Sequence, residues 1–279
     1  MMTLSEMRRI LNEGDLRLTK SLGQNFLHDG NHLRRIVAAA EIEPGEPVLE
    51  VGPGLGPLTE LLLEKAGRVL AIEKDHRLVV LLAERLGDVG HLTLVHDDAL
   101  EYFRREERNW SDWKMVANLP YSVASSILVD LAWATRRPQR MVSTLQLEVA
   151  HRLAAPPGAD DYGILTLLLQ LDYLLASWFK IPASCFFPAP DVDSACVVLC
   201  RRPAPLLPDS LRDTFRKVVK TGFSQRRKRF LKLLKPNWPG SSAAAIFAEL
   251  GLPEHIRAEE LSLEQFVALS QRLGSGTEG

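Results

Sequence analysis

Asn118, Leu119, Pro120 and Tyr121 are the residues whose types most directly suggest chemistry. The apolar strand predicted over residues 113–119 must end here, because proline does not continue a central strand. The Asn118 side-chain oxygen and the Leu119 carbonyl can accept the N–H hydrogens of an aromatic amine, which frees the nitrogen lone pair. Pro120 favours an extended Leu119, and Tyr121 can stack on the ring. The segment predicts a site for a planar amine; the alternative is simple turn chemistry.

A glycine-rich turn follows the first strand of the predicted sheet. Gly52, Gly54 and Gly56 let a ligand approach the backbone, and the helix that follows offers free N–H groups to an anion. The GxGxG spacing differs from the GxGxxG of dinucleotide-binding turns, so it weakens the prediction of a pyrophosphate site. A tight connection between a strand and a helix is the alternative.

Acidic residues end the next two predicted strands. Glu73 lies twenty-one residues after Gly52, where a carboxylate can bind both ribose hydroxyls of an adenosine. Asp97 and Asp98 end the third strand, and one of them can accept a hydrogen bond from the amine of an adenine. The alternative for these acids is helix capping, which Asp75 could provide beside Glu73.

Elements that position these residues follow from the hydrophobic pattern. Strands are predicted over residues 47–51, 68–73, 92–96 and 113–119, and helices over residues 58–66 and 77–87. Alternation of strands and helices implies right-handed crossovers and a largely parallel sheet, with ligands bound beyond the carboxyl ends of the strands. The candidate binding residues described above all lie at the carboxyl ends of predicted strands.

The second half of the chain changes character at a linker with three prolines, residues 201–210. Before it, we predict a strand running into a helix (141–155), a helix running into a strand (164–177) and a last strand (194–201). After it, only helices are predicted, over residues 211–223, 225–235, 242–251 and 262–273. The resulting organisation is an N-terminal extension (1–16), an α/β domain (17–202), a small helical domain (203–272) and a disordered tail (273–279).

Composition and charge limit the class of protein. Hydrophobic residues make up 46% of the chain and charged residues 25%, as in compact globular proteins. The net charge is −1, yet residues 201–236 hold twelve Lys or Arg and two Asp, a net charge of +10. This density favours contact with a polyanion over a merely solvated helix face. The three cysteines lack CxxC spacing, and no leader or membrane-length apolar run is seen, so we expect no metal and a cytoplasmic protein.

The tetrapeptide NLPY, residues 118–121, stands in a series of motifs. The others are KSLGQNFLHD (20–29), VLEVGPGLGPLT (48–59), EKD (73–75), DDAL (97–100) and FFPAPDVDSACVVL (186–199). In this order, over roughly residues 17–235, they closely resemble the ribosomal RNA adenine N6-dimethyltransferases, above all the bacterial small-subunit enzymes whose loss gives kasugamycin resistance. The resemblance implies a class I methyltransferase, with a Rossmann-like sheet and S-adenosylmethionine as cofactor.

The resemblance also implies roles for individual residues. Asn25 and Leu27 would contact the cofactor, and Gly52 would pass its methionine moiety. Glu73 would hold the ribose, and Asp98 would bind the adenine amine of the cofactor. The complete implied cofactor-binding set is Asn25, Leu27, Glu50, Gly52, Gly54, Glu73, Lys74, Asp98, Ala99 and Asn118.

The implied catalytic residues bind a flipped adenine of the substrate. Asn118 would lie between the cofactor and the target base, and Phe186 would stack on the adenine opposite Tyr121. A second aromatic residue, Phe187, leaves open which of the pair stacks. Two stacked faces offset the cost of unstacking a base by about 1–3 kcal/mol each. The implied catalytic set is Asn118, Leu119, Pro120, Tyr121 and Phe186.

The basic segment FSQRRKRFLKLLK (223–235) matches a signature of the same family. Arg226, Arg227, Lys228 and Arg229 are implied to bind RNA phosphates, which give affinity without sequence information. The implied reaction is successive methylation of N6 on each of two adjacent adenosines near the 3′ end of small-subunit rRNA. The implied partner is that RNA within a pre-30S or 30S particle during ribosome biogenesis, and we expect a monomeric enzyme.

Three alternatives remain. Large-subunit dimethyltransferases that confer macrolide resistance share NLPY and FxPxP, although VDSA (192–195) and FSQRRK (223–228) favour the small-subunit enzymes. A ribosome-assembly factor on the same fold, without turnover, could tolerate loss of Asn118 or Glu73, and both are present. A nicotinamide-dependent dehydrogenase is disfavoured by GxGxG and by NLPY.

Overall fold

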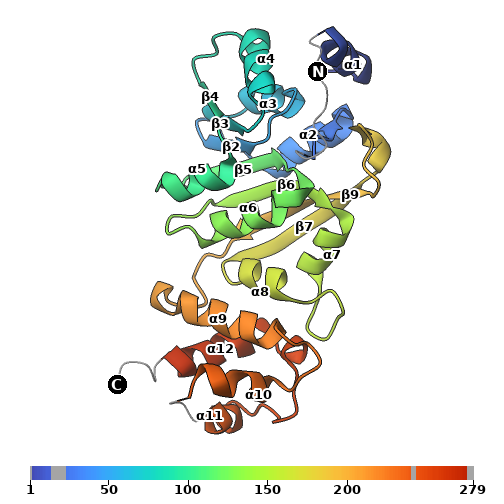
Figure 1. Ribbon diagram of the computed structural model, residues 1–279. Coiled ribbons are helices and arrows are strands. Elements are labelled where there is room, and N and C mark those ends of the chain that lie inside the picture. The colour runs from blue at the N-terminus through green and yellow to red at the C-terminus, as the bar shows by residue number, and fades with distance from the viewer. Residues whose placement is uncertain (1, 14–22, 240–242, 275–279) are drawn as a thin grey trace. The chain divides into compact units, whose positions relative to one another are not determined.

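The computed structural model describes residues 2–13, 23–239 and 243–274, and it divides into two compact units (Figure 1). The α/β unit comprises Met1–Ala150 and Leu174–Arg201. The helical unit comprises His151–Tyr173 and Arg202–Gly279. The predicted boundary near residue 202 agrees with one of the points at which the chain passes between the units.

A seven-stranded sheet, counted within the described residues, forms the centre of the α/β unit, with strand order β4-β3-β2-β5-β6-β9-β7. The strands are β2 (Pro47–Val51), β3 (Arg68–Glu73), β4 (Leu92–His96), β5 (Lys114–Asn118), β6 (Arg140–Gln146), β7 (Tyr173–Ile181) and β9 (Ser194–Arg201). Pairing is parallel from β4 through β6, and β9 runs antiparallel to β6. The predicted α/β fold with a mostly parallel sheet is confirmed.

Helices cover both faces of this sheet. On one face, α2 (Gly30–Ala39) and α3 (Pro57–Leu63) pack their apolar side chains against β2, β3, β5, β6 and β9. Elsewhere α5 (Ala99–Arg105) and α6 (Tyr121–Trp133) lie side by side (Figure 1). Every residue of β2 is buried, as expected for a central parallel strand covered on both faces. The predicted strands over residues 47–51, 68–73 and 92–96 are confirmed to the residue.

Further helices follow the carboxyl ends of these strands. Helix α4 (His76–Leu86) follows β3. Helix α7 (Leu147–Ala154) follows β6 directly, and its residues from His151 on belong to the helical unit. A separate two-stranded sheet pairs β1 (Phe26–Leu27) with β8 (Phe186–Phe187) in antiparallel register. This pairing brings the GQNFL segment next to the FFPAP segment.

The predicted N-terminal extension contains a helix, α1 (Leu4–Glu13), that the hydrophobic pattern did not reveal. Thr3 and Glu6 form reciprocal hydrogen bonds at its start, which is a capping box. Its buried residue Met7 packs with Phe26 and Leu78. The predicted domain start at residue 17 lies outside the described residues.

The helical unit is built around aromatic side chains. Its helices are α8 (Ile164–Gln170), α9 (Arg212–Phe223), α10 (Phe230–Leu234), α11 (Ala243–Glu249) and α12 (Leu263–Gly274). Phe266 lies between Phe223 and Phe230, with ring centroids 6.2 and 5.6 Å away. Helix α12 extends two residues into the predicted tail, and residues 275–279 lie outside the described part of the chain.

One segment groups differently from the prediction. His151–Tyr173, expected within the α/β domain, belongs to the helical unit. The Tyr162 hydroxyl donates to the Leu261 carbonyl oxygen at 2.9 Å, and the buried Arg212 guanidinium pairs with Asp172 at 2.5 Å. These contacts join residues far apart in the chain, so local sequence pattern does not reveal them.

The predicted helix over residues 225–235 is wrong in its first half. Residues 224–229 form a turn and α10 begins only at Phe230. The Arg226 guanidinium in this turn donates to the carbonyl oxygens of Asp160 and Tyr162. Within the described residues, no helix is long and apolar enough to cross a membrane.

Candidate active site

The side chain of Asn118, the last residue of β5, is held at both ends. Its Nδ2 donates to the Asn25 carbonyl oxygen at 2.8 Å, and its Oδ1 accepts a hydrogen bond from the Thr144 hydroxyl. Pro120 then caps α6, with φ −60° and ψ 125°, and Tyr121 begins the helix. The predicted strand over residues 113–119 is one residue shorter at each end, because β5 runs from Lys114 to Asn118.

Tyr121 is fixed through its hydroxyl. Its Oη lies 2.5 Å from Oγ of the fully buried Ser194 on β9. Burial raises the pKa of the Tyr121 phenol. The side chain is therefore a neutral, anchored ring at neutral pH, which suits stacking.

The glycine turn between β2 and α3 requires residues without a side chain. Gly52 and Gly54 have φ of 69° and 60°, in the left-handed region that favours glycine. A Cβ atom at Gly54 would lie 2.7 Å from the Phe26 ring, and one at Gly52 would lie 3.5 Å from Pro120. The turn thus allows close approach of backbone to a ligand beside Asn118.

Glu73 ends β3 next to this turn and is 7% exposed. Its carboxylate accepts hydrogen bonds from the backbone amides of Gly54 (3.1 Å) and Asp75 (2.9 Å), and burial raises the pKa of Glu73. Each carboxylate oxygen retains a second lone pair, so the group can still accept from two ribose hydroxyls. Asp75, the alternative helix cap, does cap α4 by accepting from the Arg77 amide.

Asp98 caps a helix, which was the alternative role considered for it, and its carboxylate also forms an ion pair. It caps α5 by accepting from the Leu100 amide at 2.9 Å, and it forms an ion pair with Lys74 at 2.7 Å. The Lys74 ammonium lowers the pKa of Asp98. The carboxylate therefore stays ionised as an acceptor at neutral pH.

One cavity collects most of the predicted residues. It is lined by eleven of them: Asn25, Gly52, Gly54, Glu73, Lys74, Asp98, Ala99, Asn118, Leu119, Pro120 and Tyr121. The residues that line the cavity suit S-adenosylmethionine. Carboxylates that can accept hydrogen bonds from ribose and adenine lie beside a glycine turn, which leaves room for the methionine part. No group of metal-ligating side chains occurs within the part of the chain that the structure describes.

Three predicted residues do not line this cavity. Leu27 and Phe186 are 1% and 3% exposed in the core beneath α2, because the pairing of β1 with β8 turns both inward. Phe187, the other aromatic of the pair, is more exposed and packs with Phe26. Glu50 is 1% exposed in the middle of β2, where burial raises its pKa to about 8.

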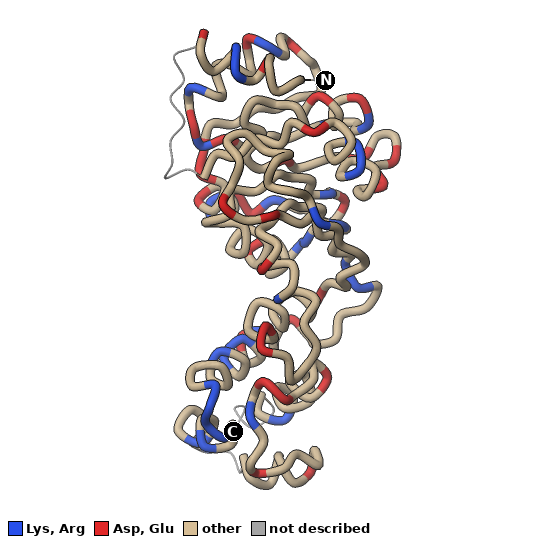
Figure 2. Tube along the Cα trace, turned by 90° about the vertical axis from the view of Figure 1, so that its right-hand side faces the viewer, with Lys and Arg blue, Asp and Glu red and all other residues tan. Residues whose placement is uncertain are grey.

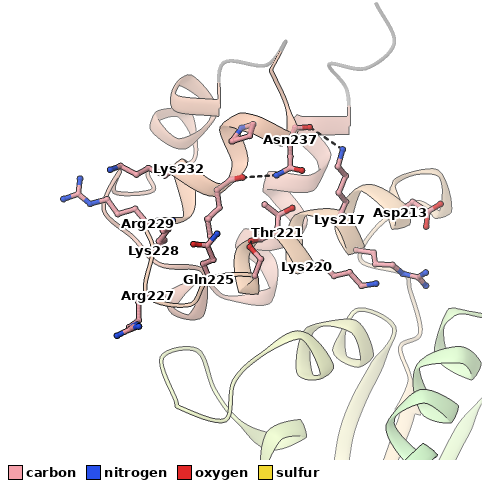
Figure 3. A pocket seen from close by; sticks show the side chains of 14 residues that line it. Asp213, Lys217, Lys220, Thr221, Gln225, Arg227, Lys228, Arg229, Lys232 and Asn237 are labelled. Atoms are coloured by element: carbon pink, nitrogen blue, oxygen red, sulfur yellow. Dashed lines mark hydrogen bonds between the residues drawn. The ribbon is translucent and has the colours of Figure 1, made fainter.

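A second feature lies in the helical unit, where Lys and Arg gather along one side (Figure 2). A groove is lined by side chains of α9, α10 and the turn between them (Figure 3). Its basic residues are Arg216, Lys217, Lys220, Arg227, Lys228, Arg229 and Lys232. Three of the four predicted RNA-binding residues are thus in one groove, with basic side chains of α9 that the prediction did not include.

Arg226 is the exception among those four. Its guanidinium pairs with Glu259 at 2.9 Å and also donates to the carbonyl oxygens of Asp160 and Tyr162. By contrast, Arg227 and Lys228 form no ion pair within the described residues. Arg226 therefore joins segments of the helical unit, whereas its neighbours are available to a ligand.

Comparison with known proteins decides the family. The ribosomal RNA adenine dimethylase family matches residues 16–274 of the chain. The chain belongs to this family. The match runs from before the GQNFL segment to the end of α12.

The names of similar proteins and solved structures agree with this family assignment. The chain is 39% identical to ribosomal RNA small subunit methyltransferase A of Geobacillus sp. (strain WCH70), over 95% of both chains, and 38% identical to that of Geobacillus kaustophilus (strain HTA426), over 95% and 94%. A solved structure, the 23S rRNA methyltransferase ErmE, is 29% identical with a TM-score of 0.67 and covers 89% of this chain and 99% of that one. A dimethyladenosine transferase from Plasmodium falciparum, 24% identical over 88% and 95% of the chains, shares the fold with a TM-score of 0.74.

For this ribosomal RNA adenine dimethylase, sequence reasoning missed several residues of the cavity wall. Gln24 and Phe26 lie inside the GQNFL segment, so the motif itself was a signal for them. No sequence signal identifies Leu78 of α4 or Ile127 of α6. An apolar residue on an amphipathic helix has the same pattern whether it packs in the core or lines a cavity. Thr144 and Ser194, the partners of Asn118 and Tyr121, lie on β6 and β9 outside the cavity wall. Ser194 is part of the VDSA motif, whereas Thr144 lies in no motif.

Proposed function

We propose that this chain transfers methyl groups from S-adenosylmethionine to N6 of adenosines in small-subunit rRNA, giving N6,N6-dimethyladenosine. The observation that carries the proposal is the held amide of Asn118 at the rim of a cavity with Glu73 and Asp98. In keeping with the resemblance, the substrate is two adjacent adenosines near the 3′ end. A pre-30S or 30S particle in the cytoplasm is the partner, and the enzyme acts as a monomer.

Cofactor binding is assigned to the residues of the cavity. Glu73 accepts from the ribose hydroxyls, Asp98 accepts from the adenine amine, and the turn at Gly52 and Gly54 passes the methionine part. Asn25, Lys74 and Ala99 complete this wall. S-adenosylmethionine, when bound, supplies an electrophilic methyl group.

The target amine is held by Asn118 and Leu119. Oδ1 of Asn118 has one lone pair engaged by Thr144, and the other accepts an N–H of the amine. The Leu119 carbonyl oxygen, which has no hydrogen bond within the described residues, accepts the second N–H. Both contacts favour a pyramidal nitrogen with its lone pair free. The methylated nitrogen is cationic and loses its proton readily, so no general base is required.

Stacking on the adenine is assigned first to Tyr121, which lines the cavity. Phe186 was the predicted second face, and its burial leaves Phe187 as the more accessible ring of the pair. Leu27 and Glu50 act from the core behind the cavity, through packing and through the position of β2. Their effects on the cofactor are therefore indirect.

RNA binding is assigned to the groove of the helical unit. Arg227, Lys228 and Arg229 contact phosphates, together with Lys220 and Lys232 of its helical walls. Arg226 is assigned a structural role instead. Such contacts give affinity and salt dependence, while the choice of adenosine is made elsewhere.

The alternative is action on large-subunit rRNA. Similarity to the 23S rRNA methyltransferase ErmE supports it, and the higher identity to small-subunit methyltransferases supports our proposal instead. A test is transfer from labelled S-adenosylmethionine to small and large subunits that lack the modification, with mass spectrometry of the nucleosides. We expect dimethyladenosine in small-subunit RNA alone. Label only in large subunits contradicts the proposal, and cofactor binding without transfer favours an assembly factor.

A further inference from the structure

Thr144 lies directly beside Asn118 in the sheet. The two residues are paired in the parallel register of β5 and β6, and both side chains therefore point to the same face. The Thr144 hydroxyl donates to Asn118 Oδ1, although Thr144 itself is fully buried and does not line the cavity. Any effect of Thr144 on the reaction must therefore pass through Asn118.

The two partners of the amide have different capacities. The Asn25 carbonyl oxygen can only accept, so it requires Nδ2 of Asn118 on its side. The hydroxyl of Thr144 supplies the donor that Oδ1 needs on the other side. Without that donor, only the Asn25 carbonyl oxygen orients the amide, and its terminal torsion, which is broad, is less restricted. The lone pairs of Oδ1 then no longer keep one fixed direction.

We propose that Thr144 is a positioning residue for methyl transfer: it holds Oδ1 of Asn118 so that the remaining lone pair faces the target amine. This inference rests on the proposed function, because it needs an amine bound at Asn118. A valine at position 144 keeps the shape of the side chain and removes the donor. Thr144→Val should lower kcat about tenfold, as expected for one lost hydrogen bond, with the Kd for S-adenosylmethionine unchanged.

The same strand provides a matched control. Ser143 is equally buried, points to the opposite face, and its hydroxyl has no hydrogen-bond partner within the described residues. Ser143→Ala therefore removes a buried hydroxyl without touching Asn118, and kcat should stay within about twofold of the wild type. Thr144→Ser, which keeps the donor, should recover most of the activity.

The experiment measures kcat, KM for small subunits and cofactor Kd in the full-length variants, with thermal melting as a check of folding. It includes the Asn118→Ala variant and the double variant with Thr144→Val. If Thr144 acts through Asn118, adding Thr144→Val to Asn118→Ala leaves the residual rate unchanged. The inference is overturned by wild-type kcat in a folded Thr144→Val, by an additive double variant, or by a Thr144→Ser as slow as the valine.

Failure of the proposed function looks different from failure of this inference. If the wild-type chain binds S-adenosylmethionine and transfers no methyl group to small subunits, the function is wrong. If the wild type is active and Asn118→Ala is not, the function stands and the Thr144 variants decide the inference alone. If Thr144→Val does not fold, the comparison of Thr144→Ser with a folded Thr144→Ala carries the same test.

Discussion

Tyr121 has a ring in the cavity and a hydroxyl that contacts the sheet. Its ring lines the cavity, while its hydroxyl lies 2.5 Å from Oγ of Ser194, which is buried and has no exposure to water. The ring can stack on a base, and the hydroxyl fixes the ring on the sheet. Substitutions that remove the hydroxyl alone or the whole ring separate these two contributions.

We expect Tyr121→Phe to retain most methyl transfer and to lose about 1 kcal/mol of stability, because the buried Ser194 hydroxyl is left unpaired. Tyr121→Ala should lower kcat/KM at least about tenfold, since stacking contributes about 1–3 kcal/mol per base. Steady-state transfer to small subunits and chemical denaturation measure the two effects. Equal losses of activity in both variants would show that the ring does not stack on the substrate.

Glu50 predicts a pH dependence of stability. Burial raises its pKa from an ordinary 4.5 to about 8, so the folded protein holds a proton that the unfolded chain releases. The stabilisation from the neutral acid is complete below about pH 4.5 and is lost as the pH rises to about 8. Glu50→Gln, which is neutral at every pH, should flatten this dependence and be more stable than the wild type at pH 8. Denaturation at pH 5, 6, 7 and 8 measures it; parallel curves for the two proteins would contradict it.

Residue types in the sequence predicted most of the cavity, and the exceptions have physical causes. NLPY, the glycine turn and the strand-end acids follow strands that the pattern defines, so their meeting point could be inferred. Phe186 could not be placed, because the face of a two-residue strand depends on its partner β1, near the other end of the chain. The contact of Thr144 with Asn118 could not be predicted either, because threonine is common in strands and its type alone does not indicate a partner.

Among the elements, the turn between α9 and α10 concentrates the charge of the helical unit. Arg226 and Arg227 are adjacent, but the first is held by Glu259 and two carbonyl oxygens and the second lines the groove (Figure 3). Two single substitutions can therefore be compared, one that removes the arginine held by Glu259 and one that removes the arginine in the groove. Total charge changes equally in the two variants.

Arg226→Ala should lower the free energy of unfolding by about 1–2 kcal/mol, because the carbonyl oxygens of Asp160 and Tyr162 lose their donor. Arg227→Ala should leave stability unchanged and weaken RNA binding, with the slope of log K against log salt reduced by about 0.7–0.9. Thermal melting and binding titrations at several salt concentrations test both. A salt slope changed only in Arg226→Ala would reverse the assignment of the two residues.

The elements that the sequence predicted well are those with a repeating apolar pattern. Strands β2, β3 and β4 are confirmed to the residue because buried parallel strands are continuous apolar runs. Residues 225–229 of this turn were predicted as helix, because their basic residues are good helix formers. The contacts of Arg226 in this turn are with Glu259 and Asp160, which are distant in the sequence, so no local pattern reveals them.

At the scale of the whole molecule, the two proposed tasks fall on different units. The cofactor cavity belongs to the α/β unit, and the basic groove belongs to the helical unit. The segment His151–Tyr173 shows the limit of sequence reasoning at this scale. Its membership in the helical unit depends on contacts such as Tyr162 with Leu261, ninety-nine residues apart, which no local pattern encodes.

The most direct measurement is nucleoside mass spectrometry of ribosomal RNA from a bacterial strain that lacks its own small-subunit dimethyladenosine and expresses this chain. We predict N6,N6-dimethyladenosine in the small-subunit RNA and none in the large-subunit RNA of that strain. Asn118→Ala, expressed at the same level and binding the cofactor normally, should reduce the rate of its appearance at least about 100-fold. Dimethyladenosine formed at the wild-type rate by Asn118→Ala, or found in large-subunit RNA alone, would contradict the account.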